Sequence, residues 1–296
     1  MLFISFRPAY FFDSTHMKRS FWLLCSTSLT LATLAGCESS KPATEVSASA
    51  GTTSPAARTA ASGEAMESNG IRLTPFSDSP KYPEAQLNEL SPIAGSTVPS
   101  GEVAFSYQVT NFILTRMSSG PHMAQMANSM KGQHIHNIVD NEPYTAHYDT
   151  KFTKAIPDGQ HVVLSFLSRS YHESLKHRGA YDLRVINVGK GPFTGPAFDT
   201  KAPAMFYSRP KDTYSGADAR RIMLDFYLVN TTLEPGGNRV RATINGTEFM
   251  LDQWVPYMME GLPAGENTVK LELVDAAGTM IPGPYNSVTR TFTVAP

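Results

Sequence analysis

The sequence predicts an all-β protein that contains two tandem β-sandwich domains. From Ile71 onward, short runs of alternating apolar and polar residues are separated by Pro, Gly and Asn, the pattern of strands joined by turns. No long stretch shows the apolar period of an amphipathic helix. The same order of runs occurs twice, each time over roughly 100 residues, a common size for one sandwich.

Composition limits the classes of partner and of site. The chain has 296 residues, a formal net charge of −1 and no basic cluster, so nucleic acid is not expected as a partner. Its two cysteines, Cys25 and Cys37, both lie near the N-terminus. We therefore expect neither a disulfide nor a thiolate metal site in the folded part of the chain.

The N-terminus has the pattern of an export signal. Positive charge at Met17-Lys-Arg-Ser precedes an apolar run, Phe21 to Ala35, that is too short for a standard membrane span. The run ends in Leu34-Ala35-Gly36-Cys37, which resembles the lipobox of bacterial lipoproteins. The resemblance implies a signal peptide at 1–36 and acylation of Cys37, with an ordinary secretory signal as the alternative. The expected location is the bacterial cell envelope, lipid-anchored to a membrane and facing the periplasm or the cell surface.

The segment 37–70 is predicted to be a flexible tether. It is rich in Ser, Thr, Ala, Gly, Pro and Glu, and it has almost no large apolar residue. Such a segment cannot bury enough surface to offset the entropy lost on ordering.

The two copies give the predicted domain boundaries. The hairpin at His134 to Val139 with Asp140-Asn141 corresponds to the one at Arg239 to Ile244 with Asn245-Gly246. In each copy a Pro-x-Gly turn then leads into a further strand. We expect a first domain at 71–188, a Gly- and Pro-rich linker at 189–203 and a second domain at 204–296.

Two resemblances extend this prediction. Leu262-Pro-Ala-Gly-Glu-Asn-Thr-Val269 and the following strand are similar to bacterial immunoglobulin-like domains, which implies that fold for the second domain. In the first domain, Gly132-Gln-His-Ile-His136 and Pro157-Asp-Gly-Gln-His161 resemble an uncharacterised family of envelope domains with a Gly-x-His-x-His strand. That second resemblance implies location and fold only.

Histidines gather in the first domain and are absent from the second. Seven of the eight lie between His122 and His177. The repeat aligns His134 and His136 with Arg239 and Arg241, at positions that face away from the sandwich core. His147, on the return strand, then lies opposite His134 or His136, depending on whether the turn is at Asp140-Asn141 or one residue later.

Three imidazoles on one face of a hairpin suit Zn²⁺ or Cu²⁺. We therefore take His134, His136 and His147 as candidate metal ligands, with His161 as a further one. The alternatives are a solvated polar face and an interface with another envelope protein.

The first copy has an insertion, 115–131, that the second lacks. A helix starting near Ser119-Gly-Pro and ending at Gly132 would place Met123, Met126 and Met130 on one face, beside His122. These four residues are candidate Cu⁺ ligands. Alternatively, the methionines pack a short helix against the sandwich.

Two weaker patterns give further alternatives. Ser168-Arg169 with His172 partly matches the phosphate-reading loop of forkhead-associated domains, which would imply a phosphopeptide-binding module. His134-x-His136 with Asp140, Pro157-Asp-Gly and His161 partly matches cupins, which would imply a metalloenzyme. Neither spacing is complete.

The sequence lacks a Gly-x-Ser-x-Gly elbow, a Walker loop and a dinucleotide fingerprint. We therefore predict a membrane-anchored, non-catalytic binding or scaffolding module that acts through the histidine face. A periplasmic copper- or zinc-binding protein is the first alternative.

Overall fold

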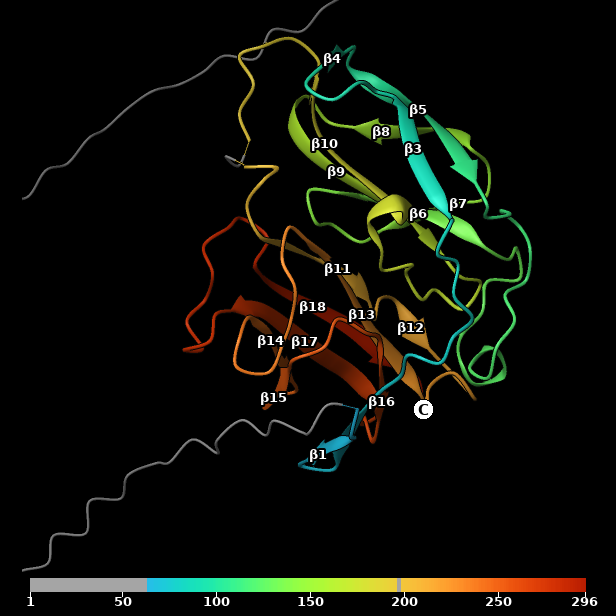
Figure 1. Ribbon diagram of the computed structural model, residues 1–296, viewed down its shortest axis with the longest axis vertical. Helices are drawn as coiled ribbons and strands as arrows, with labels where there is room; N and C mark the ends of the chain where they lie inside the picture. Colours follow the sequence, from blue (N-terminus) through green and yellow to red (C-terminus); the bar gives the residue numbers. More distant parts are fainter. Residues whose placement is uncertain (1–62, 196–197) are drawn as a thin grey trace, which may run out of the picture. The chain divides into compact units, whose positions relative to one another are not determined.

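The computed structural model describes residues 63–195 and 198–296, which belong to one compact unit. The predicted signal peptide, Cys37 and the tether up to residue 62 lie outside the described residues. Within the described part of the chain, no helix has the length and hydrophobicity needed to span a membrane. The fold is all-β, as predicted (Figure 1).

The first sandwich consists of a five-stranded sheet, β4-β10-β9-β6-β7, and a three-stranded sheet, β3-β5-β8. Apolar residues of both sheets meet in its core, among them Phe105, Ile135 and Ile186. The bounds of its strands are β3 (Gln86–Ser91), β4 (Thr97–Val98), β5 (Gly101–Thr110), β6 (His134–Val139), β7 (Thr145–His147), β8 (Lys151–Ile156), β9 (Gly159–Ser168) and β10 (Tyr181–Val188).

The second sandwich repeats this plan. When the strands of the two copies are matched in chain order, the sheet β12-β18-β17-β14-β15 has the same strand order as β4-β10-β9-β6-β7. In the other sheet, β11, β13 and β16 correspond to β3, β5 and β8. The repeat predicted from the sequence is therefore present strand by strand. The bounds are β11 (Ala204–Arg209), β12 (Thr213–Tyr214), β13 (Ile222–Val229), β14 (Arg239–Ile244), β15 (Thr247–Leu251), β16 (Tyr257–Glu260), β17 (Gly265–Val274) and β18 (Ser287–Val294).

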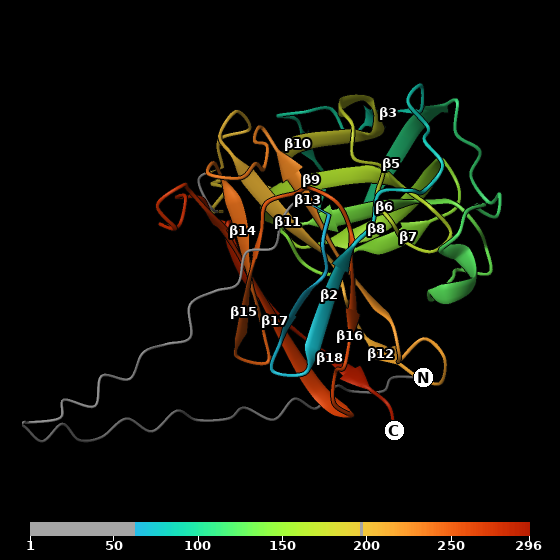
Figure 2. The same ribbon diagram turned by 60° about the horizontal axis from the view of Figure 1, so that its bottom comes forward.

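The start of the described chain belongs to the second sandwich. Strand β2 (Ile71–Pro75), which the sequence places in the first domain, pairs antiparallel with β16 (Figure 2). Strand β1 (Met66–Ser68) lies within the predicted tether and pairs with β2. Met66 and Leu73 are buried in the second core together with residues of β13 and β16. Removing this apolar surface from water stabilises the pairing of β1 and β2 with the second sandwich.

The two sandwiches bury a shared apolar layer. Ile138 and Phe166, on the outer face of the first five-stranded sheet, pack with Phe206 and Tyr227 of β11 and β13. The rings of Phe166 and Tyr227 stack with centroids 4.7 Å apart. Strands β6, β11 and β13 are consequently buried at every residue. This packing covers the face that carries His134 and His136.

The insertion does not form the predicted helix. Among its residues only Met123–Gln125 are helical, as the short 3₁₀ turn η1. The rest follows turns that end at Gly132, where a Cβ atom would lie 2.3 Å from the Thr115 carbonyl oxygen. Gly132 has a φ of +84°, so both space and backbone conformation require glycine at the start of β6.

Candidate metal centre between the two sandwiches

The hairpin that follows β6 turns where the sequence predicts. Asp140 and Asn141 have φ values of +53° and +57°, the left-handed pair of a type I′ turn, and the Glu142 N–H donates to the Val139 oxygen over 2.9 Å. Beyond the turn the first ladder pair is Asn137 with Thr145. Between this pair and the turn, the return chain has three residues, 142–144, whereas β6 has two, 138 and 139. The return chain therefore contains a bulge of one extra residue.

This extra residue decides which way His147 points. Pro143 lies within the bulged segment and has no N–H to donate to the ladder. The resulting register pairs His147 with Ile135, and the prediction that His147 lies opposite His134 or His136 is wrong. A shift of one residue moves a side chain to the other face of a strand. His147 therefore stacks on Phe152, with ring centroids 3.3 Å apart, and is not a partner of the other two histidines.

His134 and His136 do point away from the core of the first sandwich, as the repeat predicts. Their neighbour Ile135 packs in that core and Ile138 packs in the layer shared with the second sandwich. The prediction of a solvent-facing surface is wrong, because the second sandwich covers it. Both histidines are 0% exposed.

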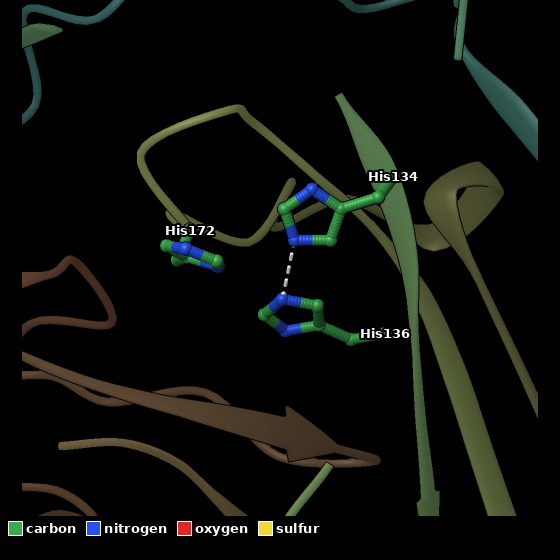
Figure 3. Close-up of side chains that lie close together, drawn as sticks. All are labelled: His134, His136 and His172. Atoms are coloured by element: carbon green, nitrogen blue, oxygen red, sulfur yellow. Dashed lines mark hydrogen bonds between the residues drawn. The ribbon is translucent and has the colours of Figure 1, made fainter. Parts of the chain in front are cut away.

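A third imidazole comes from the loop after β9. His134, His136 and His172 each offer a ring nitrogen, and these nitrogens all lie within 4.8 Å of one another (Figure 3). His134 and His136 project from β6, and His172 approaches from the loop with a φ of +67°. We call these three residues the histidine cluster.

The loop that carries His172 is held by the second sandwich. The Ser174 N–H donates to Asp225 Oδ2 over 3.3 Å, and Lys176 forms an ion pair with the same carboxylate. Tyr227 Oη donates to the Leu175 oxygen over 3.0 Å. Asp225 and Tyr227 both lie on β13, so docking of the sandwiches places His172 beside β6.

Hydrogen bonding orients the ring of His134 for metal binding. A carbonyl oxygen only accepts, so the 2.8 Å contact of His134 Nδ1 with the Gly132 oxygen places the proton on Nδ1. The lone pair of Nε2 then accepts from the Nε2–H of His136 over 2.8 Å. Metal-binding histidines commonly have this backbone partner on the second nitrogen. His136 Nδ1 is buried without a hydrogen-bond partner.

The cluster is held in the neutral form that metals bind. Burial lowers the pKa of His134 to about 4. Burial also lowers the pKa of His136 and of His172 well below the usual value, and neighbouring positive groups add to the effect. Each neutral imidazole has one lone pair at pH 7, so a metal can bind without a proton being released to solvent. For both Nε2 atoms to bind it, the proton that His136 Nε2 shares with His134 must move to His136 Nδ1.

The spacing of the cluster is close to that of a tetrahedral centre. With metal–nitrogen bonds of about 2.0–2.1 Å, tetrahedral ligands lie about 3.3 Å apart. The nitrogens of His134 and His136 are 2.8 Å apart and the set spans at most 4.8 Å. Small side-chain rotations would therefore bring the three nitrogens around one Zn²⁺ or Cu²⁺ ion.

Aromatic and cationic groups surround the cluster. The Tyr144 ring stacks on His136 with centroids 3.6 Å apart, and its Oη lies 3.3 Å from His172 Nδ1. Arg209 Nε donates to Tyr144 Oη over 3.0 Å, and Lys211 Nζ lies 4.6 Å from the centre of the same ring. Tyr144 lies on the same face as His136 because of the bulge.

Sequence reasoning missed His172, Arg209 and Lys211 as parts of one site. The concentration of histidines between residues 122 and 177 was the available signal for His172. No sequence signal connects Arg209 and Lys211 to the cluster, because they belong to the second copy.

His161, a further candidate ligand, has a structural role instead. Its Nδ1 lies 2.5 Å from Asp140 Oδ2 and its Nε2 lies 2.8 Å from the Pro157 oxygen. Both nitrogens are therefore engaged at the turn. This pairing also removes the cupin-like set, since Asp140 and His161 bind each other and do not join His134 and His136.

The predicted Cu⁺ site of the insertion is not assembled. Met126 is buried in a cluster with Phe76, Tyr171, Met223 and Met258, which agrees with the packing alternative. Met123 and Met130 are exposed. His122 pairs with Asp78 and packs against Phe76, so it does not join the methionines or the histidine cluster.

The loop 168–172 is not an open phosphate-binding loop. Ser168 and Ser170 are fully buried, and Arg169 forms an ion pair with Glu173 over 3.1 Å. These side chains hold the loop together, and they are not presented to a peptide ligand.

Comparison with known proteins gives a fold-level likeness only. No family model matches the chain, and no curated protein matches it. Among solved structures, the fibronectin(III)-like modules of CbhA from Clostridium thermocellum are 11% identical, with a TM-score of 0.25, over 71% of this chain and 94% of that one.

Two other structures are similar at the same level. The central fibronectin-III array of RIM-binding protein is 10% identical, with a TM-score of 0.23, over 74% of this chain and 69% of that one. The surface protein SGBP-B of a Bacteroides ovatus mixed-linkage glucan locus, solved with a heptasaccharide, is 9% identical, with a TM-score of 0.22. The match covers 70% of this chain and 47% of that protein. Likeness at this level carries no argument about ligands.

Proposed function

We propose that this chain is a binding module that holds one divalent transition-metal ion, Zn²⁺ or Cu²⁺, at His134, His136 and His172. The convergence of three ring nitrogens within 4.8 Å, two of them from buried residues, supports this proposal. His136 Nδ1 is buried without a hydrogen-bond partner, and a buried polar group costs free energy unless it has one. The proposed role is metal binding between the two sandwiches, without catalysis.

Metal binding to the purified full chain, without a polyhistidine tag, tests the proposal. We expect about one Zn²⁺ or Cu²⁺ per chain after dialysis, measured by elemental analysis and calorimetry. His172→Ala should weaken binding on the order of 100-fold, because one of three ligands is lost. His172 is partly exposed, so its replacement should leave the sandwiches folded.

His147→Ala is the matched control. His147 lies on the same hairpin, but on the other face, and burial lowers its pKa to about 4 as well. Its removal should leave metal affinity unchanged. Equal loss of binding in the two variants, or no tight metal in the wild type, would refute the assignment.

We further propose that the module is anchored to a membrane of the bacterial cell envelope through acylated Cys37. The lipobox-like Leu34-Ala35-Gly36-Cys37 supports this proposal. Cys37→Ala should leave the precursor uncleaved or release the protein from membranes, measured by fractionation and mass spectrometry. Membrane retention with an unchanged mass shift would contradict it.

A further inference from the structure

Arg209 is a buried cation without an acidic partner. It is 8% exposed, its Nε donates to Tyr144 Oη, and its guanidinium lies 5.7 Å from the centre of the Tyr214 ring. It makes no ion pair with any of the residues that the structure describes. Asp225, its cross-strand neighbour on β13, is already paired with Lys176. A buried arginine is normally paired with an anion.

The unpaired charge faces the histidine cluster. Tyr144 Oη bridges the two, since it accepts from Arg209 and lies 3.3 Å from His172 Nδ1. Lys211, over the Tyr144 ring, adds a second positive charge, which is partly balanced by the exposed Asp212.

A divalent ion bound by neutral histidines would therefore lie among positive charges. Coulomb repulsion in a buried site is much stronger than in water, so such an ion needs a compensating anion. Three histidines leave the fourth position of a tetrahedral centre open, and Arg209 offers the forked donor geometry that matches carboxylates and phosphates.

We infer that the fourth ligand of the metal is a small oxyanion, of the carboxylate or phosphate class, held on its other side by Arg209. The inference rests on the proposed function. The size limit follows from burial, because His134 and His136 are fully enclosed and His172 is the only partly exposed member of the cluster. The protein would thus bind metal and oxyanion together, each raising the affinity for the other.

Titration of the Cu²⁺-loaded full chain tests this inference. Acetate and phosphate, added separately, should shift the visible absorption and the electron paramagnetic resonance spectrum to saturation, and the two titrations distinguish the two classes of anion. Arg209→Gln should weaken anion binding by at least about tenfold. In buffer free of both anions, the same variant should bind Cu²⁺ more tightly, because a nearby positive charge is removed.

These opposite changes separate an anion-binding role from a structural one, since a damaged fold would lower both affinities. If Arg209→Gln does not fold, Arg209→Lys keeps the charge but loses the fork, and it should still weaken anion binding. Arg221→Gln is the control, because Arg221 is half-exposed, pairs with Glu260 and should leave both affinities unchanged.

The outcomes separate the two proposals. If Cu²⁺ binds but neither anion changes its spectrum, or if Arg209→Gln responds like the wild type, the oxyanion inference is overturned and the metal site stands. If Cu²⁺ does not bind tightly at the histidine cluster, the proposed function fails and the inference fails with it.

Discussion

At the scale of single residues, His161 and Asp140 form a clasp that the second sandwich reproduces with other side chains. Asp140 Oδ1 accepts from the Val162 N–H over 2.8 Å, and Asn245 Oδ1 accepts from the Thr268 N–H over 2.9 Å. His161 reaches the Pro157 oxygen, and Asn267 donates to the Pro263 oxygen over 2.9 Å. The histidine thus does in one copy what an asparagine does in the other.

This equivalence predicts how His161 variants behave. His161→Asn combined with Asp140→Asn should keep most of the stability, because the pair then reproduces the second copy, in which the Asn245 amide donates to Asn267 Oδ1 and Asn267 Nδ2 donates to the Pro263 oxygen. His161→Ala should lower the free energy of unfolding by about 1–2 kcal/mol, since it leaves two partly buried acceptors, Asp140 Oδ2 and the Pro157 oxygen, without this donor. Chemical denaturation measures the free energy of unfolding of both variants. An equal loss of stability in the two would contradict the proposed equivalence of these hydrogen bonds in the two copies.

Glu89 is a buried carboxyl group that should make stability depend on pH. Its side chain is fully buried, and it shares Arg184 with Asp182. Burial raises its pKa from 4.5 to about 8, although Arg184 acts in the opposite direction. The folded state therefore retains a proton that the unfolded state releases, and stability should fall as pH rises from about 4.5 toward 8.

Glu89→Gln removes this titration and provides the test. Between pH 5 and pH 8 the wild type should lose stability relative to the variant, by on the order of 1 kcal/mol per pH unit where the slope is steepest. Denaturant midpoints at several pH values measure the difference. Parallel pH profiles would show that Glu89 is ionised in the folded state across this range.

At the scale of elements, the loop between β9 and β10 connects the metal ligand His172 to the second sandwich. Asp225 is fully buried and accepts from both Ser174 and Lys176. The position of His172 therefore depends on a carboxylate that lies on another domain.

Asp225→Ala should weaken metal binding without touching a ligand. We expect about a tenfold to hundredfold loss of affinity, as is typical when a group that orients a ligand is removed. Some stability should be lost as well, because Lys176 keeps a nearly buried charge without its partner. Glu260→Ala, which breaks the partly exposed pair with Arg221, is the control. Unchanged affinity in a destabilised Asp225 variant would show that the loop is positioned by other contacts.

At the scale of the whole molecule, the second sandwich extends beyond residues 204–296. The repeat suggests that this segment contains a full set of strands, yet β2 extends the sheet at β16. Met66, Ile71 and Leu73 are buried in the second core. The chain therefore closes its C-terminal sandwich with a strand from the other end of the folded region.

Removing that strand should destabilise the protein. A chain beginning at residue 76 loses three buried apolar side chains and the β2–β16 ladder, compared with a chain beginning at residue 63. At about 1.5–3 kcal/mol per buried side chain, the loss should reach about 5 kcal/mol. Denaturation of the two chains measures the difference, and equal midpoints would show that β2 contributes little.

The sequence by itself determined the features that depend on local period and turn chemistry. It predicted the all-β class, the tandem repeat, the left-handed turn at Asp140-Asn141 and the shared face of His134 and His136. Side chains two residues apart on a strand must share a face, and residues such as Asn and Asp tolerate the turn conformation. These features need no knowledge of distant contacts.

Only the tertiary structure decided which residues complete the site. One extra residue around Pro143 turned His147 away, and no local pattern distinguishes that bulge from a regular hairpin. His172 and Arg209 reach the cluster because a loop and a strand dock across the layer between the sandwiches. Burial of the histidine face has the same cause. Contacts between distant segments depend on how whole surfaces pack, and a local pattern of residues does not specify that packing.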